Sequence, residues 1–240
     1  MSEKIRLDKF ISSQRQDLSR SIVKTLCRKG SVKVNGEIVK KPETSVSADD
    51  CITVNGEKIN YRKYMYIMMN KPQGVVCSTK DGISKTVLEL VPQELLREGM
   101  FPAGRLDKDT EGFVLLTDDG ELAHKMLSPK SHVPKTYFVR LENKWADDYK
   151  DKIANGLTID GNEKCLPADF EGSNSSPFEC TIILHEGKFH QVKRMFAALG
   201  NKVIYLKRVQ IGGLALNSDL ALGECMEIMH KDVEKLLLKN

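Results

Sequence analysis

Residues 101–113, FPAGRLDKDTEGF, combine a carboxylate-rich loop with the start of an apolar strand. Asp107, Asp109 and Glu111 lie close together in this stretch, and glycines stand on both sides of them. The apolar run 113–117 that follows predicts a buried strand, which ends in an Asp-Asp-Gly turn. We therefore expect several acidic side chains at the edge of a core strand.

Three kinds of chemistry could use these carboxylates. A metal site is disfavoured because the loop lacks the D-x-[DN]-x-[DN]-G spacing and the strand separates it from the next acidic residues. A glycosidase pair needs two carboxylates that oppose each other, which Asp107 and Asp109 need not do. The third is a single nucleophilic or basic aspartate, oriented by cations such as Arg105 and by one from a distant basic segment. The residues alone leave these alternatives open.

Strands and helices alternate irregularly around this loop. Strands are expected over residues 66–69, 75–77, 113–117, 137–141, 179–185 and 203–206, and helices over 87–96, broken by Pro92, 122–127 and 191–199. There is no regular βαβ rhythm and no G-x-G-x-x-G loop. These patterns predict an α+β fold with a mixed, largely antiparallel sheet flanked by helices.

The N-terminal quarter has its own pattern. Leu18, Ile22 and Leu26 recur every four residues and predict a short amphipathic helix, and an Asn-Gly turn at 35–36 predicts a hairpin. The polar stretch 57–64 separates this part from the apolar runs that follow. We expect a small domain over residues 1–60 and a larger one over 61–240.

Positive charge is concentrated in two places. The chain has a formal net charge of +4, and residues 1–60 hold 12 Lys and Arg against 8 Asp and Glu. The stretch 187–218 contains no carboxylate, and its cations are Lys188, Lys193, Arg194, Lys202, Lys207 and Arg208. Such clusters suit a polyanion, because neutralising phosphates releases counterions.

Several classes of protein are disfavoured by composition. The longest uncharged stretch, residues 209–218, is ten residues long, about half of the ~20 that a membrane span needs. The N-terminus lacks the apolar core of a signal peptide, and the six cysteines form no C-x-x-C pair. No heptad pattern indicates a coiled coil. We expect a cytoplasmic monomer with no membrane segment and no metal site.

Four short motifs at the N-terminus carry a resemblance. They are Arg6–Phe10, Ser19–Arg20, Gly30–Gly36 and Asp50–Val54. In order and spacing they resemble an S4 domain, an RNA-binding module. The resemblance implies that structured RNA docks on the basic side chains Arg6, Lys9, Arg20, Lys24 and Lys29.

The larger domain carries a second resemblance. Residues 101–113, 115–120, 135–137 and 186–195 are similar to the motifs of pseudouridine synthases, in the branch typified by RsuA. The two resemblances together cover essentially the whole chain. In that branch an S4 domain also precedes the catalytic domain.

The second resemblance implies a reaction and its residues. Such enzymes break the uridine C1′–N1 bond, rotate the uracil and rejoin it through C5, without an external cofactor. Asp107 would be the essential carboxylate, Tyr137 would stack on the flipped base, and Lys193 would pair with Asp107 and hold it ionised. Whether Asp107 attacks the sugar or removes a proton from it stays open.

Further residues are expected to contact RNA. Arg105 would touch RNA or fill the space of the extruded nucleotide, unless it pairs internally with a nearby carboxylate. Adjacent residues on a helix point in different directions, so Arg194 is expected to contact phosphate or protein while Lys193 faces Asp107. Lys188 and His190 are also expected on the RNA-binding surface.

The substrate is inferred from the same resemblance. Residues 128–137 and 189–201 are most similar to the enzyme that modifies small-subunit rRNA, whereas large-subunit relatives carry Arg-Asn-Arg-Gln-Ile-Arg-Arg in place of the His-Gln-Val-Lys-Arg segment. We therefore expect a 16S rRNA uridine as the target and ribosomal RNA in a small-subunit assembly particle as the partner. Large-subunit rRNA, or a non-catalytic S4-type assembly factor, are the alternatives.

Overall fold

The computed structural model describes residues 4–15 and 17–239 and divides into two compact units. The N-terminal unit comprises Met1–Met65 together with Pro92–Met100. The larger unit comprises Tyr66–Val91 and Phe101–Asn240. None of the helices in the described ranges has the length and apolar character of a membrane span.

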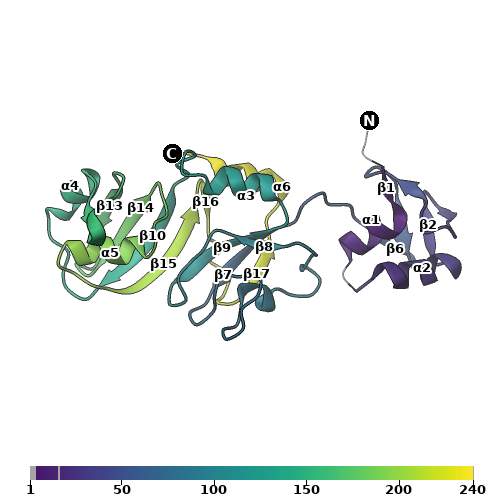
Figure 1. Cartoon of the computed structure of the whole chain (residues 1–240), viewed down its shortest axis with the longest axis horizontal. Helices are drawn as coiled ribbons and strands as arrows, with labels where there is room; N and C mark the ends of the chain where they lie inside the picture. The colour runs from purple at the N-terminus through teal and green to yellow at the C-terminus, as the bar shows by residue number, and fades with distance from the viewer. Residues whose placement is uncertain (1–3, 16, 240) are drawn as a thin grey trace. The chain divides into compact units, whose positions relative to one another are not determined.

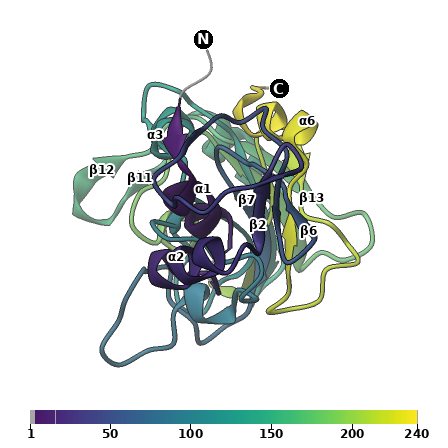
Figure 2. The ribbon, with the colours of Figure 1, turned by 90° about the vertical axis from the view of Figure 1, so that its right-hand side faces the viewer.

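In the N-terminal unit, two helices pack beside a small antiparallel sheet of order β3-β2-β5-β6 (Figure 2). The elements are β1 (Ile5–Arg6), α1 (Leu7–Gln14), α2 (Arg20–Arg28), β2 (Val32–Val34), β3 (Glu37–Ile38), β4 (Ser45–Val46), β5 (Ile52–Val54) and β6 (Glu57–Ile59). Leu7, Phe10 and Ile11 of α1 are fully buried in the core. This core holds the helices against the sheet.

The predicted helix and hairpin of this unit are confirmed, with one correction. The Ser19 side chain accepts a hydrogen bond from the Ile22 amide and caps α2, and the hairpin turn has positive φ angles at residues 35 and 36. The buried face of α2 is formed by Val23 and Cys27, whereas Ile22 is 44% exposed. Leu18 and Leu26 pack against the core as partly buried residues, so the prediction was wrong for Ile22 alone.

The larger unit is built on one mixed sheet of order β13-β14-β10-β15-β9-β7-β17, in which β16 pairs with β15 and β8 with β9 (Figure 1). Its strands are β7 (Tyr66–Lys71), β8 (Phe101–Ala103), β9 (Glu111–Thr117), β10 (Lys135–Leu141), β13 (Asp169–Gly172), β14 (Glu179–Leu184), β15 (Val203–Ile211), β16 (Leu214–Ala215) and β17 (Cys225–Glu227). All neighbours are antiparallel except β9 and β15. The α+β fold with a largely antiparallel sheet is confirmed.

Helices flank this sheet (Figure 1). They are α3 (Gly120–Leu127), α4 (Tyr149–Ala154), α5 (Gln191–Ala198) and α6 (His230–Val233), with 3-10 turns η1 (Val87–Leu90), η2 (Asp160–Asn162) and η3 (Glu234–Leu237) and a short ribbon of β11 (Thr158–Ile159) and β12 (Glu163–Lys164). One core lies under α3, where Met126 meets Phe113 and Leu115 of β9.

The parallel pairing of β9 with β15 depends on a glycine. Gly112 lies opposite Arg208 and has a φ of +104°. A Cβ at this position would overlap the main chain of Arg208. The close approach brings the start of β9, just after the carboxylate loop, against the middle of β15.

Two expected elements differ from the structure. Residues 75–77 form no strand but contribute a single bridge, Val76 to Thr86. The helix expected over 87–96 ends at Leu90, and the chain then passes into the N-terminal unit. Arg97 is held there because its guanidinium donates to the carbonyls of Ser13 and Arg62 at 3.0 and 3.1 Å. The predicted division into residues 1–60 and 61–240 did not include this return of Pro92–Met100 to the N-terminal unit.

Candidate active site

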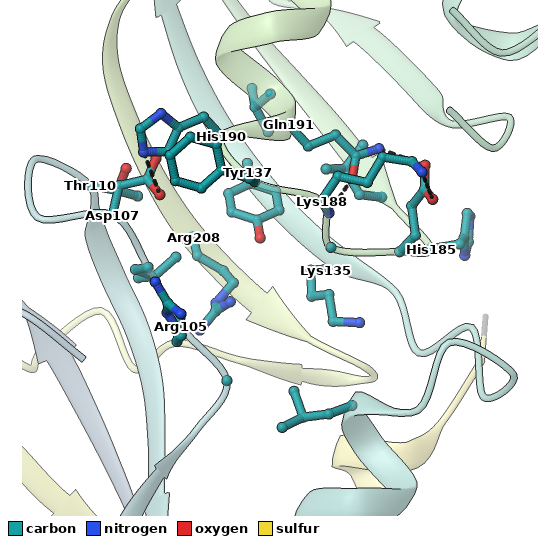
Figure 3. A pocket seen from close by; sticks show the side chains of 18 of the residues that line it. Arg105, Asp107, Thr110, Lys135, Tyr137, His185, Lys188, His190, Gln191 and Arg208 are labelled. Carbon is teal, nitrogen blue, oxygen red and sulfur yellow. Dashed lines mark hydrogen bonds and ion pairs between the residues drawn. The ribbon is translucent and has the colours of Figure 1, made fainter. Parts of the chain in front are cut away.

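A cleft of about 610 Å³ opens in the larger unit, where the carboxylate loop meets the central strands (Figure 3). Four segments line it: the loop after β8, residues 127–129 at the end of α3, the start of β10, and the turn from β14 into α5. Leu206 and Arg208 of β15 complete the lining. Of the residues predicted to act in the reaction, Asp107 and Tyr137 line this cleft directly.

The loop that carries Asp107 is fixed by a buried lysine. Lys71, at the end of β7, is fully buried. Its ammonium donates to the carbonyls of Pro72, Asp107 and Thr110 at 3.0, 3.0 and 2.8 Å. Burial lowers the pKa of Lys71. Lys71 was not among the residues predicted for this site, because no local pattern indicates its distant carbonyl partners.

Asp107 is paired with Lys193 of α5, as expected. The Lys193 ammonium lies 3.0 Å from Asp107 Oδ2 and 2.6 Å from Asp109 Oδ1. Burial opposes the charged form of Lys193, but the hydrogen bonds with Asp109 and Asp107 outweigh it and raise the pKa of its ammonium. The hydrogen bond from Lys193 also lowers the pKa of Asp109. One cation therefore orients both carboxylates of the loop.

His190 approaches Asp107 from the other side. Its Nε2 lies 3.5 Å from Asp107 Oδ1. The residue has a left-handed backbone, with φ of 47°, at the start of α5, and its ring stacks on Phe189 with centroids 3.8 Å apart. The sequence predicted an RNA contact here but not this proximity to Asp107.

Tyr137 projects from β10 into the cleft (Figure 3). It lies opposite Ile182 of β14 and Arg208 of β15. Its side chain is largely buried, at 8% exposure. The ring is therefore packed at the wall of the cleft, with its hydroxyl on the side of Arg208 and Lys135 (Figure 3).

The other predicted RNA contacts of this unit fall into two groups. Arg105 is exposed, lines the cleft and has no ion pair with a carboxylate in the part of the chain that the structure describes. Lys188 lines the cleft but pairs with Glu163 at 3.1 Å. Arg194 does not line the cleft, and it binds Glu163 at 2.8 Å and the carbonyl of Phe189 at 3.1 Å. Arg194 therefore contacts protein groups, which is one of the two roles expected for it.

In the N-terminal unit the five predicted RNA-binding cations are all exposed: Arg6, Lys9, Arg20, Lys24 and Lys29. Arg6 and Arg20 converge on the fully buried Asp8, at 3.1 and 3.2 Å. The hydrogen bond from Arg6 lowers the pKa of Asp8. Asp8 thus fixes two arginines at the surface of this unit.

Comparison with known proteins agrees with this architecture. Residues 65–198 match the family model for RNA pseudouridylate synthase, and residues 5–52 match that for the S4 domain. The chain belongs to the RNA pseudouridylate synthase family, with an S4 domain at its N-terminus. A crystal structure described as pseudouridylate synthase is similar at a TM-score of 0.68 and 40% identity, covering 97% of this chain and 99% of the other.

Curated relatives indicate which type of pseudouridine synthase the chain is similar to. The ribosomal small subunit pseudouridine synthase A of Haemophilus influenzae is 41% identical over 97% of this chain and 100% of the relative, and that of Escherichia coli K12 is 39% identical over the same shares. An uncharacterized RNA pseudouridine synthase of Bacillus subtilis, YtzG, is 43% identical over 97% of this chain and 98% of the relative. The protein is a pseudouridine synthase of the RsuA type.

Proposed function

We propose that this enzyme converts one uridine of 16S rRNA to pseudouridine and that Asp107 is its essential carboxylate. The observation that carries the proposal is the Asp107–Lys193 pair, 3.0 Å apart, at a cleft that also holds Tyr137. The small-subunit relatives support the choice of RNA, since they align over nearly their whole length.

The cleft suits a base that has left its stack. A uridine within a strand is inaccessible to a side chain, and extruding it costs a few kcal/mol. A volume of about 610 Å³ lies within the range of small-molecule sites. The ring of Tyr137 offers a rigid surface on which the extruded uracil can stack.

In the proposed reaction Asp107 acts at the sugar. Its carboxylate either attacks C1′ or removes a proton from the ribose, and the C1′–N1 bond breaks. The uracil then turns and its C5 bonds to C1′. This step releases the Asp107 carboxylate from C1′ in the first case, and in the second the ribose proton returns from Asp107. The C5 proton then leaves and N1 becomes protonated. Atoms and electrons balance within the nucleotide, so the proposal includes no external cofactor.

Lys193 serves this step by orientation. Its ammonium fixes Oδ2 of Asp107, and the main chain beneath is fixed by Lys71. Because both the main chain and the carboxylate of Asp107 are held, the side chain loses little further conformational entropy when it reaches the reacting geometry. Arg105, exposed at the cleft, is available to the RNA strand around the extruded nucleotide.

Tritium release tests the proposal. Small-subunit rRNA carrying uridine tritiated at C5 is incubated with the purified enzyme, with Asp107→Asn and with Asp109→Asn as a neighbouring control. Release by the wild type and by Asp109→Asn, but not by Asp107→Asn, is the expected result. Equal release by Asp107→Asn would overturn the role of Asp107.

The RNA is tested in parallel reactions. Naked small-subunit rRNA, small-subunit assembly particles and large-subunit rRNA are compared with the same enzyme. Release from large-subunit rRNA alone would overturn the choice of substrate. No release from any of these RNAs would favour a binding factor that has lost catalysis.

A further inference from the structure

Two cations at one wall of the cleft have no carboxylate partner. Arg208 lies on β15 and Lys135 begins β10, the neighbouring strand, and both line the cleft. In Figure 3 both side chains lie on the hydroxyl side of Tyr137, whereas His190 lies on the opposite side of the ring. Neither cation has a carboxylate within ion-pair distance among the residues that the structure describes.

Arg208 is buried with part of its hydrogen-bonding capacity unused. Only 4% of the residue is exposed. Its Nε donates to the carbonyl of Phe113 at 2.8 Å, while Nη2 is buried and has no partner within the described ranges. Buried polar groups are normally hydrogen-bonded, so an orphaned guanidinium nitrogen beside a cleft needs an explanation.

Lys135 likewise has an ammonium whose one hydrogen bond among the described residues is to a main-chain carbonyl. Its ammonium donates to the carbonyl of Val133 at 2.8 Å. Burial, and secondly the positive charge of Arg208, lower the pKa of Lys135 to about 8. Lys193 and Lys188, by contrast, each have carboxylate partners. Arg105 lines the cleft without such a partner, but it is exposed to solvent rather than buried. The carboxylates of the lining are engaged elsewhere, Asp107 by Lys193 and Glu186 by Gln191.

We propose that Arg208 and Lys135 form a subsite for a phosphodiester anion of the RNA, next to the extruded uridine. The proposal rests on the proposed function, because it assumes an RNA substrate in this cleft. A phosphate oxygen can accept from a guanidinium and an ammonium at once, and its charge removes the repulsion between the two cations. A neutral uracil carbonyl would supply a hydrogen bond but no compensating charge.

The first test requires no turnover. Lys135 in the purified wild-type enzyme is labelled with trace acetic anhydride near pH 8, and the extent is read by mass spectrometry. Uridine 5′-monophosphate and inorganic phosphate are expected to slow labelling of Lys135 at least about threefold, while uridine does not. Lys152, exposed and paired with Asp148, is the internal control whose labelling should stay constant.

The outcomes of this test separate the alternatives. Loss of the protection in Arg208→Met supports a shared subsite. Equal protection by uridine would assign the two cations to base recognition and overturn the proposal, as would an absence of protection by uridine 5′-monophosphate. These results hold whether or not pseudouridine is formed, so they are distinct from failure of the proposed function.

The second test measures the salt dependence of RNA binding. Lys135→Met is expected to weaken binding about tenfold and to reduce the slope of log affinity against log salt by about one, as loss of a phosphate contact does. Lys152→Met should leave both unchanged. A weakened affinity with an unchanged slope would overturn the phosphate assignment. Thermal unfolding of each variant shows that the change is not a loss of folding.

Discussion

The ammonium of Lys71 donates a 3.0 Å hydrogen bond to the main-chain carbonyl of Asp107, while the Asp107 side chain binds Lys193. One residue is therefore held by two lysines from different elements, Lys71 of β7 through the main chain and Lys193 of α5 through the side chain. The first sets where the loop lies and the second sets where the carboxylate points. This division of labour leads to separate predictions for the two lysines.

Lys71→Met should destabilise the larger unit and reduce turnover. The variant removes the donor to several buried carbonyls, which costs about 2–4 kcal/mol when buried groups lose their partners. Urea denaturation and tritium release measure the two effects. Lys108→Met is the control, since exposed Lys108 binds only Ser84 among the described residues; equal stability of the two variants would contradict the prediction.

Lys193→Met should fold normally but lose about 100-fold in turnover, since Asp107 loses the group that orients it. Lys193→Arg keeps the positive charge and should stay within about tenfold of the wild type. Initial rates at saturating RNA measure both variants. Wild-type turnover by Lys193→Met would show that the pair is not needed for the reaction.

Asp8→Asn should destabilise the N-terminal unit by about 1–3 kcal/mol at pH 7, because Arg6 and Arg20 lose a charged acceptor. The pKa of Asp8 is lowered in the folded chain. Its stabilising contribution is therefore complete above the unfolded value of about 3.9 and is lost as the pH falls through the native value. Urea denaturation of the full chain at pH 7 and at lower pH should show the difference from the wild type shrinking with acid.

Gly112→Ala should destabilise the larger unit by at least about 1–3 kcal/mol, since an added Cβ meets the main chain of Arg208 at a positive φ. Gly120→Ala is the matched control, because Gly120 begins α3 and a Cβ there meets nothing within 4 Å. Thermal unfolding compares the two. A similar midpoint for both variants would show that β9 and β15 can separate to admit the methyl group.

Sequence patterns predicted the parts of the fold that depend on local spacing. The strand at 113–117, the Asn-Gly hairpin and the helix around residues 20–28 follow from periodicity and turn chemistry, and the structure contains all three. Leu7, Phe10 and Ile11 have the spacing of one helix face in α1, but this spacing does not indicate that Asp8 between them is fully buried. The carboxylate of Asp8 is accommodated only because arginines from two elements reach it, which no local pattern reveals.

The candidate site shows the same limit. Asp107, Tyr137 and Lys193 were identified through motifs, whereas Lys71 and Arg208 were missed as members of the site. Both are buried cations, and burial of a charge is unfavourable unless a tertiary partner compensates it. Lys71 finds its partners in the carbonyls of a loop more than 30 residues away in sequence, and Arg208 contacts the strand beside its own. Neither contact has a signature in composition or spacing.

The passage of Pro92–Met100 through the N-terminal unit makes the chain discontinuous with respect to its own domains. A foreign S4 domain joined at residue 65 would replace only one of the two segments that form the N-terminal unit. Arg97 would then meet the main chain of a different sequence in place of the carbonyls of Ser13 and Arg62. Exchange of RNA-targeting modules among such enzymes should therefore succeed when the two segments are transplanted together. In this enzyme the exchangeable RNA-binding unit is a pair of chain segments, and no single position in the sequence separates it from the rest.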